Sequence, residues 1–484
     1  MGEGHPLLEL GVTPDSIWGD YEIESTVYAQ VLGQVRALIF RFHLSTNKLP
    51  HSLSSRIVSG YHDLEVSNEA FTFQDRGAMR STIWSTIATV WPNCITDPIV
   101  FEPGVVIDLT SNEAGEIIWL AYREPLFTQY LNLLRNIQPS DLVAKDHSPS
   151  IVDISEVVLL EAMGGRGCCK RVKVRAGSGE PSIFVFKGID FHTYLQLHDD
   201  DDEFAHAMVE TWRWSSKLIA DMPPHPNIQS PPKMLVSIHS SNDDSVFMGH
   251  LSTFFAKGDL RAKIATTNSK GTHISLLQKA KWCYQMSRAI AHTHRVMHTY
   301  HMDIKPGNFI IDDEDNLILI DWEQSGAPAT TLAPEADGTW DVNEQNTNGE
   351  CRAIKLVYTN YTGPERRNMP EGGGQERFNI WNVFPEWQAS CPRALELAEV
   401  YALGRSMWML LSQTADDFDD VLHPNDVRIT WDNKNNLPPH WITMVEKCMD
   451  KDPNERPLVV DVVEFWELEQ LFLDNSPPKV STIG

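Results

Sequence analysis

Several features that would place a chain in a familiar class are scarce or missing here. The 484 residues include seven cysteines and no Cys-x-x-Cys pair, so the cysteines indicate neither a disulfide framework nor a zinc knuckle. The N-terminus lacks the basic segment and apolar core of a secretory signal, and Arg36 and Arg41 interrupt the early apolar stretch. We therefore expect no membrane span and a cytoplasmic location, with the nucleus as the alternative.

Basic residues are also fewer than acidic residues. Lys and Arg total 40 against 66 Asp and Glu, which leaves a net charge of −26. DNA, RNA and anionic membrane surfaces would repel such a chain, so we predict no nucleic-acid partner. The apolar share of 42% and the charged share of 22% are ordinary for a globular protein. The length is sufficient for one large two-lobed domain with an additional module.

The spacing of apolar residues changes along the chain. Residues 1–150 mix helical and strand-like spacing without legible chemistry, and we expect an N-terminal accessory region there that could bind a protein partner. Short apolar runs after residue 151 predict five antiparallel strands with one helix between the third and the fourth, and the chain after Asp259 is mainly helical. We therefore predict an α+β protein with an accessory region (1–150), a strand-rich lobe (151–256), a helical lobe (257–472) and a tail (473–484).

The strongest chemical signal lies between His301 and Glu323. Residues 301–308 read HMDIKPGN, and an apolar strand-turn-strand pattern then leads to Asp321-Trp322-Glu323. Asn308 follows Asp303 by five residues, which is the spacing of the HRDxxxxN catalytic loop, and Asp321 stands where that family has the Asp of its DFG motif. The segment resembles the catalytic loop and metal-binding motif of the eukaryotic protein kinase superfamily, and Lys305 makes it similar to the Ser/Thr-specific members.

This resemblance implies ATP- and Mg²⁺-dependent phosphoryl transfer to Ser/Thr hydroxyls of protein substrates. Asp303 would orient the acceptor hydroxyl and receive its proton, and Lys305 would contact the transferred phosphate. Asn308 and Asp321 would present oxygen ligands to Mg²⁺, which prefers carboxylate and amide oxygens. The resemblance also implies a bilobal protein-kinase-like fold, in which a five-stranded antiparallel sheet with one helix faces a mainly helical lobe.

A weaker signal upstream resembles the glycine-rich phosphate loop of the same family. Residues 165–172 read GRGCCKRV, against the family pattern GxGxxGxV, with Lys170 in place of the third glycine. The resemblance assigns Gly165, Gly167 and Val172 to nucleotide binding. Glycines suit this position because backbone amides without a neighbouring Cβ can approach phosphate closely.

Further nucleotide contacts follow from the same resemblance. Lys187 ends an apolar strand similar to the VAIK strand and would hold the α- and β-phosphates of ATP as part of the catalytic set. We expect Glu210 to pair with Lys187, with Glu203 as the rival. The hinge between the lobes would include Thr253 and Phe255, where backbone groups could bond the adenine.

Three segments extend the resemblance towards the C-terminus. Gly363-Pro364-Glu365 resembles the APE element, residues 399–404 (EVYALG) resemble the DxWxxG helix, and residues 452–457 (DPNERP) resemble the late DPxxRP motif. In the family, the Glu of the first element and the Arg of the last form a buried ion pair. The resemblance therefore implies that Glu365 meets Arg456.

Departures from the family pattern leave two alternatives open. Met302 replaces an Arg, Glu323 replaces the Gly of DFG, and Glu399 replaces an Asp. The Asp-Trp-Glu string is similar to that of aminoglycoside and choline kinase relatives, which act on small molecules. The substitutions at Lys170 and Glu323 favour a third interpretation, a pseudokinase that serves as a nucleotide-binding scaffold.

Overall fold

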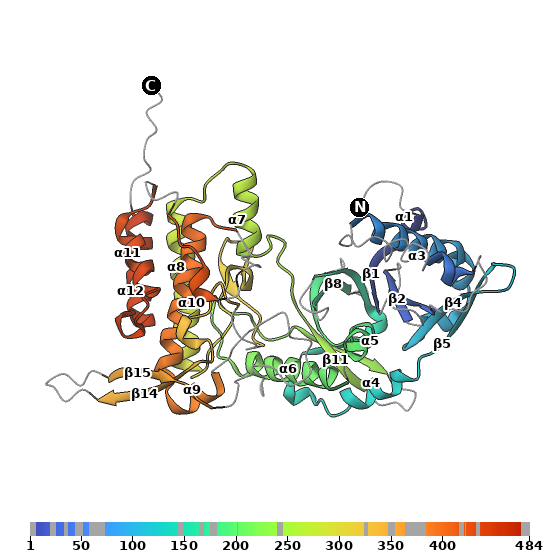
Figure 1. Ribbon diagram of the computed structural model, residues 1–484, viewed down its shortest axis with the longest axis horizontal. Coiled ribbons are helices and arrows are strands. Elements are labelled where there is room, and N and C mark those ends of the chain that lie inside the picture. Colours follow the sequence, from blue (N-terminus) through green and yellow to red (C-terminus); the bar gives the residue numbers. More distant parts are fainter. Residues whose placement is uncertain are drawn as a thin grey trace, which may run out of the picture. The chain divides into compact units, whose positions relative to one another are not determined.

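The computed structural model describes residues 6–19, 26–32, 37–43, 52–57, 73–143, 149–163, 169–174, 182–200, 202–239, 245–323, 328–346, 354–363, 384–415, 421, 423–431 and 436–475. The protein is α+β and divides into two compact units (Figure 1). The first unit combines residues 1–213 with 232–254, and the second combines 214–231 with 255–484. Residues 1–150 therefore share a unit with the strand-rich segment that follows them.

The first unit begins with a five-stranded sheet in the order β1-β2-β3-β4-β5. All neighbours are antiparallel except β3 and β4, which run parallel because helix α3 connects them. Both faces of the sheet are covered, since alternate residues of β3 such as Phe40 and Ile39 belong to different apolar cores. The elements are α1 (Pro6–Glu9), β1 (Thr13–Gly19), β2 (Thr26–Leu32), β3 (Ala37–His43), α3 (Phe73–Cys94), β4 (Val105–Ser111) and β5 (Ile117–Arg123).

A second sheet of the same unit has six strands in the order β6-β10-β11-β9-β8-β7. We predicted five antiparallel strands; the sixth, β6, pairs in parallel with β10 and makes the sheet mixed. Two helices, α5 and α6, stand where one was predicted, and α6 continues into the second unit. The elements are α4 (Leu126–Leu134), β6 (Ser150–Asp153), β7 (Val157–Ala162), β8 (Cys169–Val174), β9 (Ile183–Gly188), α5 (Phe191–Asp200), α6 (Asp202–Asp221), β10 (Met234–His239) and β11 (Ser245–Thr253).

The second unit is mainly helical and is built around α10. Every residue of α10 from Leu397 to Leu411 is buried, which is typical of a helix surrounded by other elements. Side chains from α8, α11 and α12, including Trp282, Trp441 and Trp466, complete this core. The elements are α7 (Leu260–Ser269), α8 (Leu276–Val296), β12 (Phe309–Ile311), β13 (Leu317–Leu319), β14 (Trp340–Asn346), β15 (Ile354–Asn360), α9 (Phe384–Ser390), α10 (Pro392–Ser412), α11 (Pro439–Cys448) and α12 (Val459–Asp474).

Helix length and polarity bear on the predicted absence of a membrane span. Across the described ranges, none of the helices combines the length and the continuous apolar character that crossing a bilayer demands.

Candidate functional site

The loop from His301 to Asn308 lies directly beside the segment that carries Asp321. The buried His301 ring contacts the carbonyl oxygen of Ile320 through Nε2 at 2.8 Å. The backbone N–H of Ile320 donates to the carbonyl oxygen of Asn308 at 2.9 Å. The short hairpin of β12 and β13 returns the chain to this point. The two motifs that the sequence singled out are therefore adjacent within the second unit.

Asp303 is held by the other polar residues of its own loop. Lys305 Nζ donates to Asp303 Oδ2 at 2.7 Å, and Asn308 Nδ2 donates to the same oxygen at 3.0 Å. The Asn308 amide also donates to the Asp303 carbonyl oxygen at 2.7 Å, which fixes the turn of the loop. The other carboxylate oxygen, Asp303 Oδ1, is buried and has no hydrogen-bond partner within the described part of the chain. Because such an oxygen is costly to leave unsatisfied, it favours a hydroxyl or water as its partner.

Glu399 on α10 makes two polar contacts that hold this loop in place. Its Oε1 accepts the backbone N–H of Met302 at 2.6 Å, and its Oε2 lies 2.6 Å from His294 Nε2. Met302 has a φ of 64°, a left-handed conformation that is strained for a residue with a side chain. The bond that the Met302 N–H donates to Glu399 stabilises that conformation. Glu399, which replaces the Asp of the family pattern, therefore has a structural role.

Asp321 itself also adopts a left-handed conformation, with a φ of 69°. The next residue, Trp322, is fully buried and packs edge-on against His301, with ring centroids 4.7 Å apart. Backbone strain of this kind is concentrated at functional sites, where the surroundings maintain it. The buried Trp322 anchors the strained residue beside the Asp303 loop.

The donor set suits Mg²⁺ better than a transition metal. The Asn308 amide nitrogen is engaged by Asp303, which leaves its oxygen as the atom for a metal, next to the Asp321 segment. No group of three or more His, Cys, Asp or Glu side chains gathers in a metal-binding arrangement among the described residues. Mg²⁺ commonly takes only one or two protein oxygens and keeps water or phosphate for the rest. Asn308 and Asp321 thus supply oxygen types that Mg²⁺ accepts, and the described residues form no closed protein cage.

The predicted pair between Glu365 and Arg456 is corrected by the structure. The buried Arg456 guanidinium forms a bidentate ion pair with Glu335, at 2.5 Å for Nη1 to Oε1 and 2.9 Å for Nη2 to Oε2. Glu365 lies outside the described residues. The residues before Glu335 are Ala333 and Pro334, so the sequence contains a literal Ala-Pro-Glu that we overlooked in favour of Gly363-Pro364-Glu365.

The register of the second sheet separates two residues that we assigned to one nucleotide site. In the β8–β9 pair, Val172 stands opposite Phe184, whereas Lys187 stands opposite Cys169. Side chains alternate between the faces of a strand, so Val172 and Lys187 point to opposite faces. Val172 is buried on the face that also carries Lys170 and Phe186. Val172 and Lys187 therefore do not share a face of the sheet.

The expected pairing of Glu210 with Lys187 is not supported either. The Glu210 side chain is 68% exposed and lies 3.6 Å from Arg213, one turn further along α6. The buried stripe of this helix consists of apolar residues, among them Met208, Val209 and Trp212. Glu210 points away from that stripe because successive residues rotate by about 100° around a helix. The side chain of the rival Glu203 lies outside the described residues.

Two of the remaining predicted nucleotide contacts, Thr253 and Phe255, lie where the chain passes from the first unit to the second. Thr253 is the last residue of β11, and Phe255 is the first residue of the second unit after the boundary at 254. These two residues therefore flank the connection between the units. Gly165 and Gly167 lie outside the described residues.

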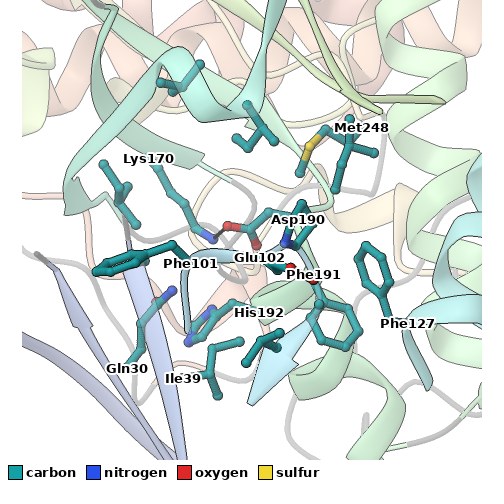
Figure 2. Close-up of a pocket in the computed structure, with 18 of the residues that line it drawn as sticks. Gln30, Ile39, Phe101, Glu102, Phe127, Lys170, Asp190, Phe191, His192 and Met248 are labelled. Carbon is teal, nitrogen blue, oxygen red and sulfur yellow. Dashed lines mark hydrogen bonds and ion pairs between the residues drawn. The ribbon is translucent and has the colours of Figure 1, made fainter. Parts of the chain in front are cut away.

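The structure also reveals a buried polar cluster that the sequence did not suggest. Lys170, only 2% exposed, forms an ion pair with Asp190 and donates to the Thr193 hydroxyl at 3.1 Å. Figure 2 shows the Lys170 ammonium directed at Asp190 inside a cavity. Although burial opposes ionisation, the Lys170 charge lowers the pKa of Asp190 to about 2. The residue that we took as a replaced glycine is therefore one half of a buried ion pair.

His192 belongs to the same cluster. Burial, assisted by the positive charge of Lys170, lowers the pKa of its imidazole to about 3, so the ring is neutral. Its Nε2 lies 3.1 Å from the Ser16 hydroxyl on β1, which links the first sheet to helix α5. Lys170 precedes Asp190 and His192 by about twenty residues, and the packing of β8 against the segment after β9 brings the lysine to them.

Comparisons with known proteins do not place the chain in a family. No family model matches it, and no curated protein matches it either. The functional interpretation therefore depends on the geometry of the second unit and on the motif resemblance described above.

Proposed function

We propose that this protein transfers the γ-phosphoryl group of ATP to Ser/Thr hydroxyls of protein substrates, on a bilobal protein-kinase-like fold. The observation that carries the proposal is the Asp303 carboxylate, whose Oδ2 is held by Lys305 and Asn308 while the buried Oδ1 has no partner in the described chain. A carboxylate that two neighbouring donors hold in position through one oxygen is suited to receive the proton of an acceptor hydroxyl.

Lys305 combines two functions in this proposal. Its ammonium group lies 2.7 Å from Asp303 Oδ2 and is about one-third exposed, so it can also reach a phosphate oxygen. Such a cation would neutralise charge that develops on the transferred group. Lys187 on β9 would hold the α- and β-phosphates of ATP.

Asn308 and Asp321 would hold Mg²⁺. When bound, Mg²⁺ would neutralise phosphate charge and orient the γ-phosphoryl group. His301 keeps the Asp321 segment in position through the Ile320 carbonyl, and Glu399 keeps Met302 in its strained conformation. The protein therefore contributes a rigid frame more than covalent chemistry, as phosphoryl transfer requires.

A protein acceptor is favoured over a small alcohol by the Glu335–Arg456 pair. This buried ion pair matches the one that protein kinases form between the APE glutamate and the late arginine. Lys305, two residues after the base, supports the same choice. The small-molecule alternative has only the Asp-Trp-Glu string in its favour.

A second candidate function, a nucleotide-binding scaffold without turnover, is supported by the first unit. Val172 lies on the opposite face of the sheet from Lys187, and the exposed Glu210 lies beside Arg213. The kinase resemblance implies instead that both residues lie near Lys187. A scaffold would keep the bonded loop of residues 301–308 in the second unit but would not transfer a phosphoryl group. Residues 1–150 would then recruit a protein partner.

The test uses the full chain with labelled ATP, Mg²⁺ and two acceptor sets, a mixture of Ser/Thr peptides and a panel of small alcohols. We expect label on the peptides. Asp303→Asn should reduce the transfer rate by about 10²- to 10⁴-fold, the usual contribution of a positioned base. Asp313→Asn, at the exposed turn between β12 and β13, is the matched control and should keep the wild-type rate.

Each other outcome selects against the proposal. Label on small alcohols alone selects the small-molecule kinase. ATP binding in calorimetry without transfer selects the scaffold. A transfer rate that Asp303→Asn leaves unchanged removes Asp303 from the chemistry.

A further inference from the structure

We propose that strand β5 binds β5 of a second copy of this chain, so that the five-stranded sheets of the two copies continue into one another as an antiparallel pair. β5 (Ile117–Arg123) is the last strand of that sheet, and β4 is its one neighbour among the described strands (Figure 1). An edge strand presents unpaired backbone N–H and C=O groups, which another strand can bind. The proposal concerns the first unit and does not depend on phosphoryl transfer.

The direction of the β5 backbone groups follows from the two hydrogen bonds that bracket the β4–β5 ladder. The Asn112 N–H donates to the Glu116 carbonyl oxygen at 3.0 Å, and the Glu124 N–H donates to the Gly104 carbonyl oxygen at 2.8 Å. The register between these bonds is unbroken. Successive residues of an antiparallel strand direct their backbone groups alternately towards the partner and away from it. The even-numbered residues of β5 therefore face β4.

The odd-numbered residues of β5 direct their N–H and C=O groups away from β4. They are Ile117, Trp119, Ala121 and Arg123. None of these backbone groups has a hydrogen-bond partner in the part of the chain that the structure describes. Donors and acceptors thus alternate along this edge in the pattern that a further strand requires.

The other three edges of the two larger sheets have features that hinder pairing. β1 contains Pro14, which lacks a donor, and its register shifts beside that residue. The register of β7 shifts between Leu159 and Glu161, and β6 is four residues long. Bulges, prolines and short strands are the usual protection of a sheet edge. β5 has seven residues, no proline and an unbroken register, so it lacks this protection.

The side chains of β5 are mostly apolar on both faces of the sheet. On one face, Ile117, Trp119 and Ala121 pack against the core that α3 shares. On the other face, Ile118 is 47% exposed and Leu120 is 63% exposed. Large apolar side chains that are exposed beside an unpaired edge indicate a surface that a partner covers.

One register makes the backbone of β5 complementary to itself. A twofold axis beside Leu120 pairs Ile117 of each copy with Arg123 of the other, and Trp119 of each copy with Ala121 of the other. These are the positions whose backbone groups point outward, so all of them gain partners. A shift of the register in either direction leaves some of them unpaired.

The same register matches the side chains. Leu120 faces Leu120 of the other copy, and Ile118 faces Tyr122. These residues occupy the non-hydrogen-bonded positions, where opposite side chains lie closest. Pairs of aromatic and β-branched side chains are favourable there. The exposed face of β5 therefore gains apolar contacts from a second copy.

The charges at the two ends of β5 agree with an antiparallel pair. The exposed Glu116 precedes the strand and the exposed Arg123 ends it, so the acidic start of one copy meets the basic end of the other. The bond between Arg123 and Glu102 is exposed and 3.3 Å long, which leaves Arg123 able to exchange partners. Glu116 also faces Glu124, but Arg41 compensates the charge of Glu124 at 2.7 Å. Backbone, side chains and charges thus select a second copy as the occupant.

The experiment combines sedimentation equilibrium with hydrogen exchange on the full chain. A single strand edge is smaller than a standard interface, so we expect a dimer with a dissociation constant of about 10 µM. A salt concentration of about 150 mM limits the repulsion between copies that each carry a net charge of −26. Exchange in the peptide that contains residues 117–123 should slow as the dimer forms, because the outward N–H groups are then bonded.

Leu120→Lys tests the twofold axis. It places two ammonium groups opposite each other, so the dimer should weaken at least about tenfold. Both Leu120 and Leu468 are exposed, at 63% and 66%, and replacing either should leave the fold intact. Leu468→Lys on α12 is therefore the matched control and should keep the wild-type dissociation constant.

A mixture of two variants gives a test that only self-pairing can pass. Leu120→Glu alone should also weaken the dimer, because it places two carboxylates opposite each other. The mixture of Leu120→Lys with Leu120→Glu should associate at least about tenfold more tightly than either variant alone, since opposite charges then meet.

Four results would overturn the proposal. The first is a monomer at all concentrations up to about 200 µM, and the second is a dimer in which exchange of residues 117–123 is not slowed. The third is a wild-type dissociation constant for Leu120→Lys, and the fourth is a mixture that associates no more tightly than its components. If the chain stays monomeric while a Lys-flanked peptide of alternating Val and Thr protects residues 117–123, the edge binds a strand of another protein instead.

Discussion

The two units differ in how far a sequence motif determines the position of its side chains. In the second unit, the predicted residues Asp303, Lys305 and Asn308 bond to one another within a single short loop. In the first unit, Val172 and Lys187 belong to adjacent strands but face opposite ways. Within one short loop, local hydrogen bonds fix the relative positions of the motif residues. For residues on separate strands, the register of the strands decides which face each side chain occupies.

The comparison extends to the buried ion pairs of the two units. Arg456 and Glu335 join in bidentate geometry, and Arg456 also donates to the Leu397 carbonyl oxygen. Lys170 and Asp190 meet beside a cavity, and the Asp190 side chain is 19% exposed. The pair in the second unit is therefore enclosed by packing, while the pair in the first unit has space next to it.

Arg456→Met tests the enclosed pair and has the largest expected effect on stability. The variant leaves the Glu335 carboxylate buried without its partner, which should lower the free energy of unfolding by about 3–5 kcal/mol. Urea unfolding combined with hydrogen exchange, resolved by peptide, should place the loss in the second unit. The loss should be much smaller in the double variant with Glu335→Leu, because no uncompensated charge then remains.

Lys170→Met provides the comparison in the first unit. Its effect should be smaller than that of Arg456→Met, because Asp190 is closer to space that water can enter. An equal or larger loss for Lys170→Met would contradict the contrast between the two pairs.

Acidification should weaken the first unit, and this effect is intermediate in size. Burial lowers the pKa values of both His192 and His250 to about 3, whereas the unfolded chain titrates near 6.5. The stabilisation is complete above pH 6.5 and is lost as the pH falls towards 3, because only the unfolded state then takes up the proton. Each histidine should contribute up to about 1.4 kcal/mol per pH unit in this window.

The pH effect is measured by urea unfolding at pH 7 and pH 5, followed by hydrogen exchange in peptides of the first unit. His192→Gln and His250→Gln should each flatten the dependence, and His206→Gln, at an exposed position of α6, should leave it unchanged. The pKa of Asp190, about 2, keeps its own contribution below this range. A stability that does not change between pH 7 and pH 5 would rule out neutral buried imidazoles.

Glu210→Ala has the smallest expected effect. The side chain is exposed and makes one long ion pair, so the free energy of unfolding should change by less than about 0.5 kcal/mol. ATP affinity should also stay within about twofold, because the residue faces away from the buried side of α6. A large loss of ATP affinity would restore Glu210 as the partner of Lys187.

Some of the corrected predictions were within reach of the sequence. The apolar spacing of Ala205, Met208, Val209 and Trp212 marks the buried face of α6 and excludes Glu210 from it. The Ala-Pro-Glu string that ends at Glu335 was also readable. Both signals were local, and we preferred matches to the expected family layout.

Other features could not be predicted from the sequence. The face on which Val172 lies depends on a pairing register, and a shift by one residue reverses it. The cavity around Lys170 and His192 requires two sheets to pack together, so its residues come from distant segments. The parallel strand β6 is similar, because its partner β10 lies far along the chain. Contacts of this kind depend on tertiary structure.

The burial of α10 has a consequence for protein synthesis. This helix leaves the ribosome before α11, which supplies part of its cover. At roughly 5–20 residues per second, translation from the end of α10 to the end of α12 takes several seconds. During that interval the part of the apolar α10 surface that α11 covers is exposed and invites aggregation. Premature termination before α11 should therefore yield an insoluble product, and a nascent-chain chaperone should recognise α10.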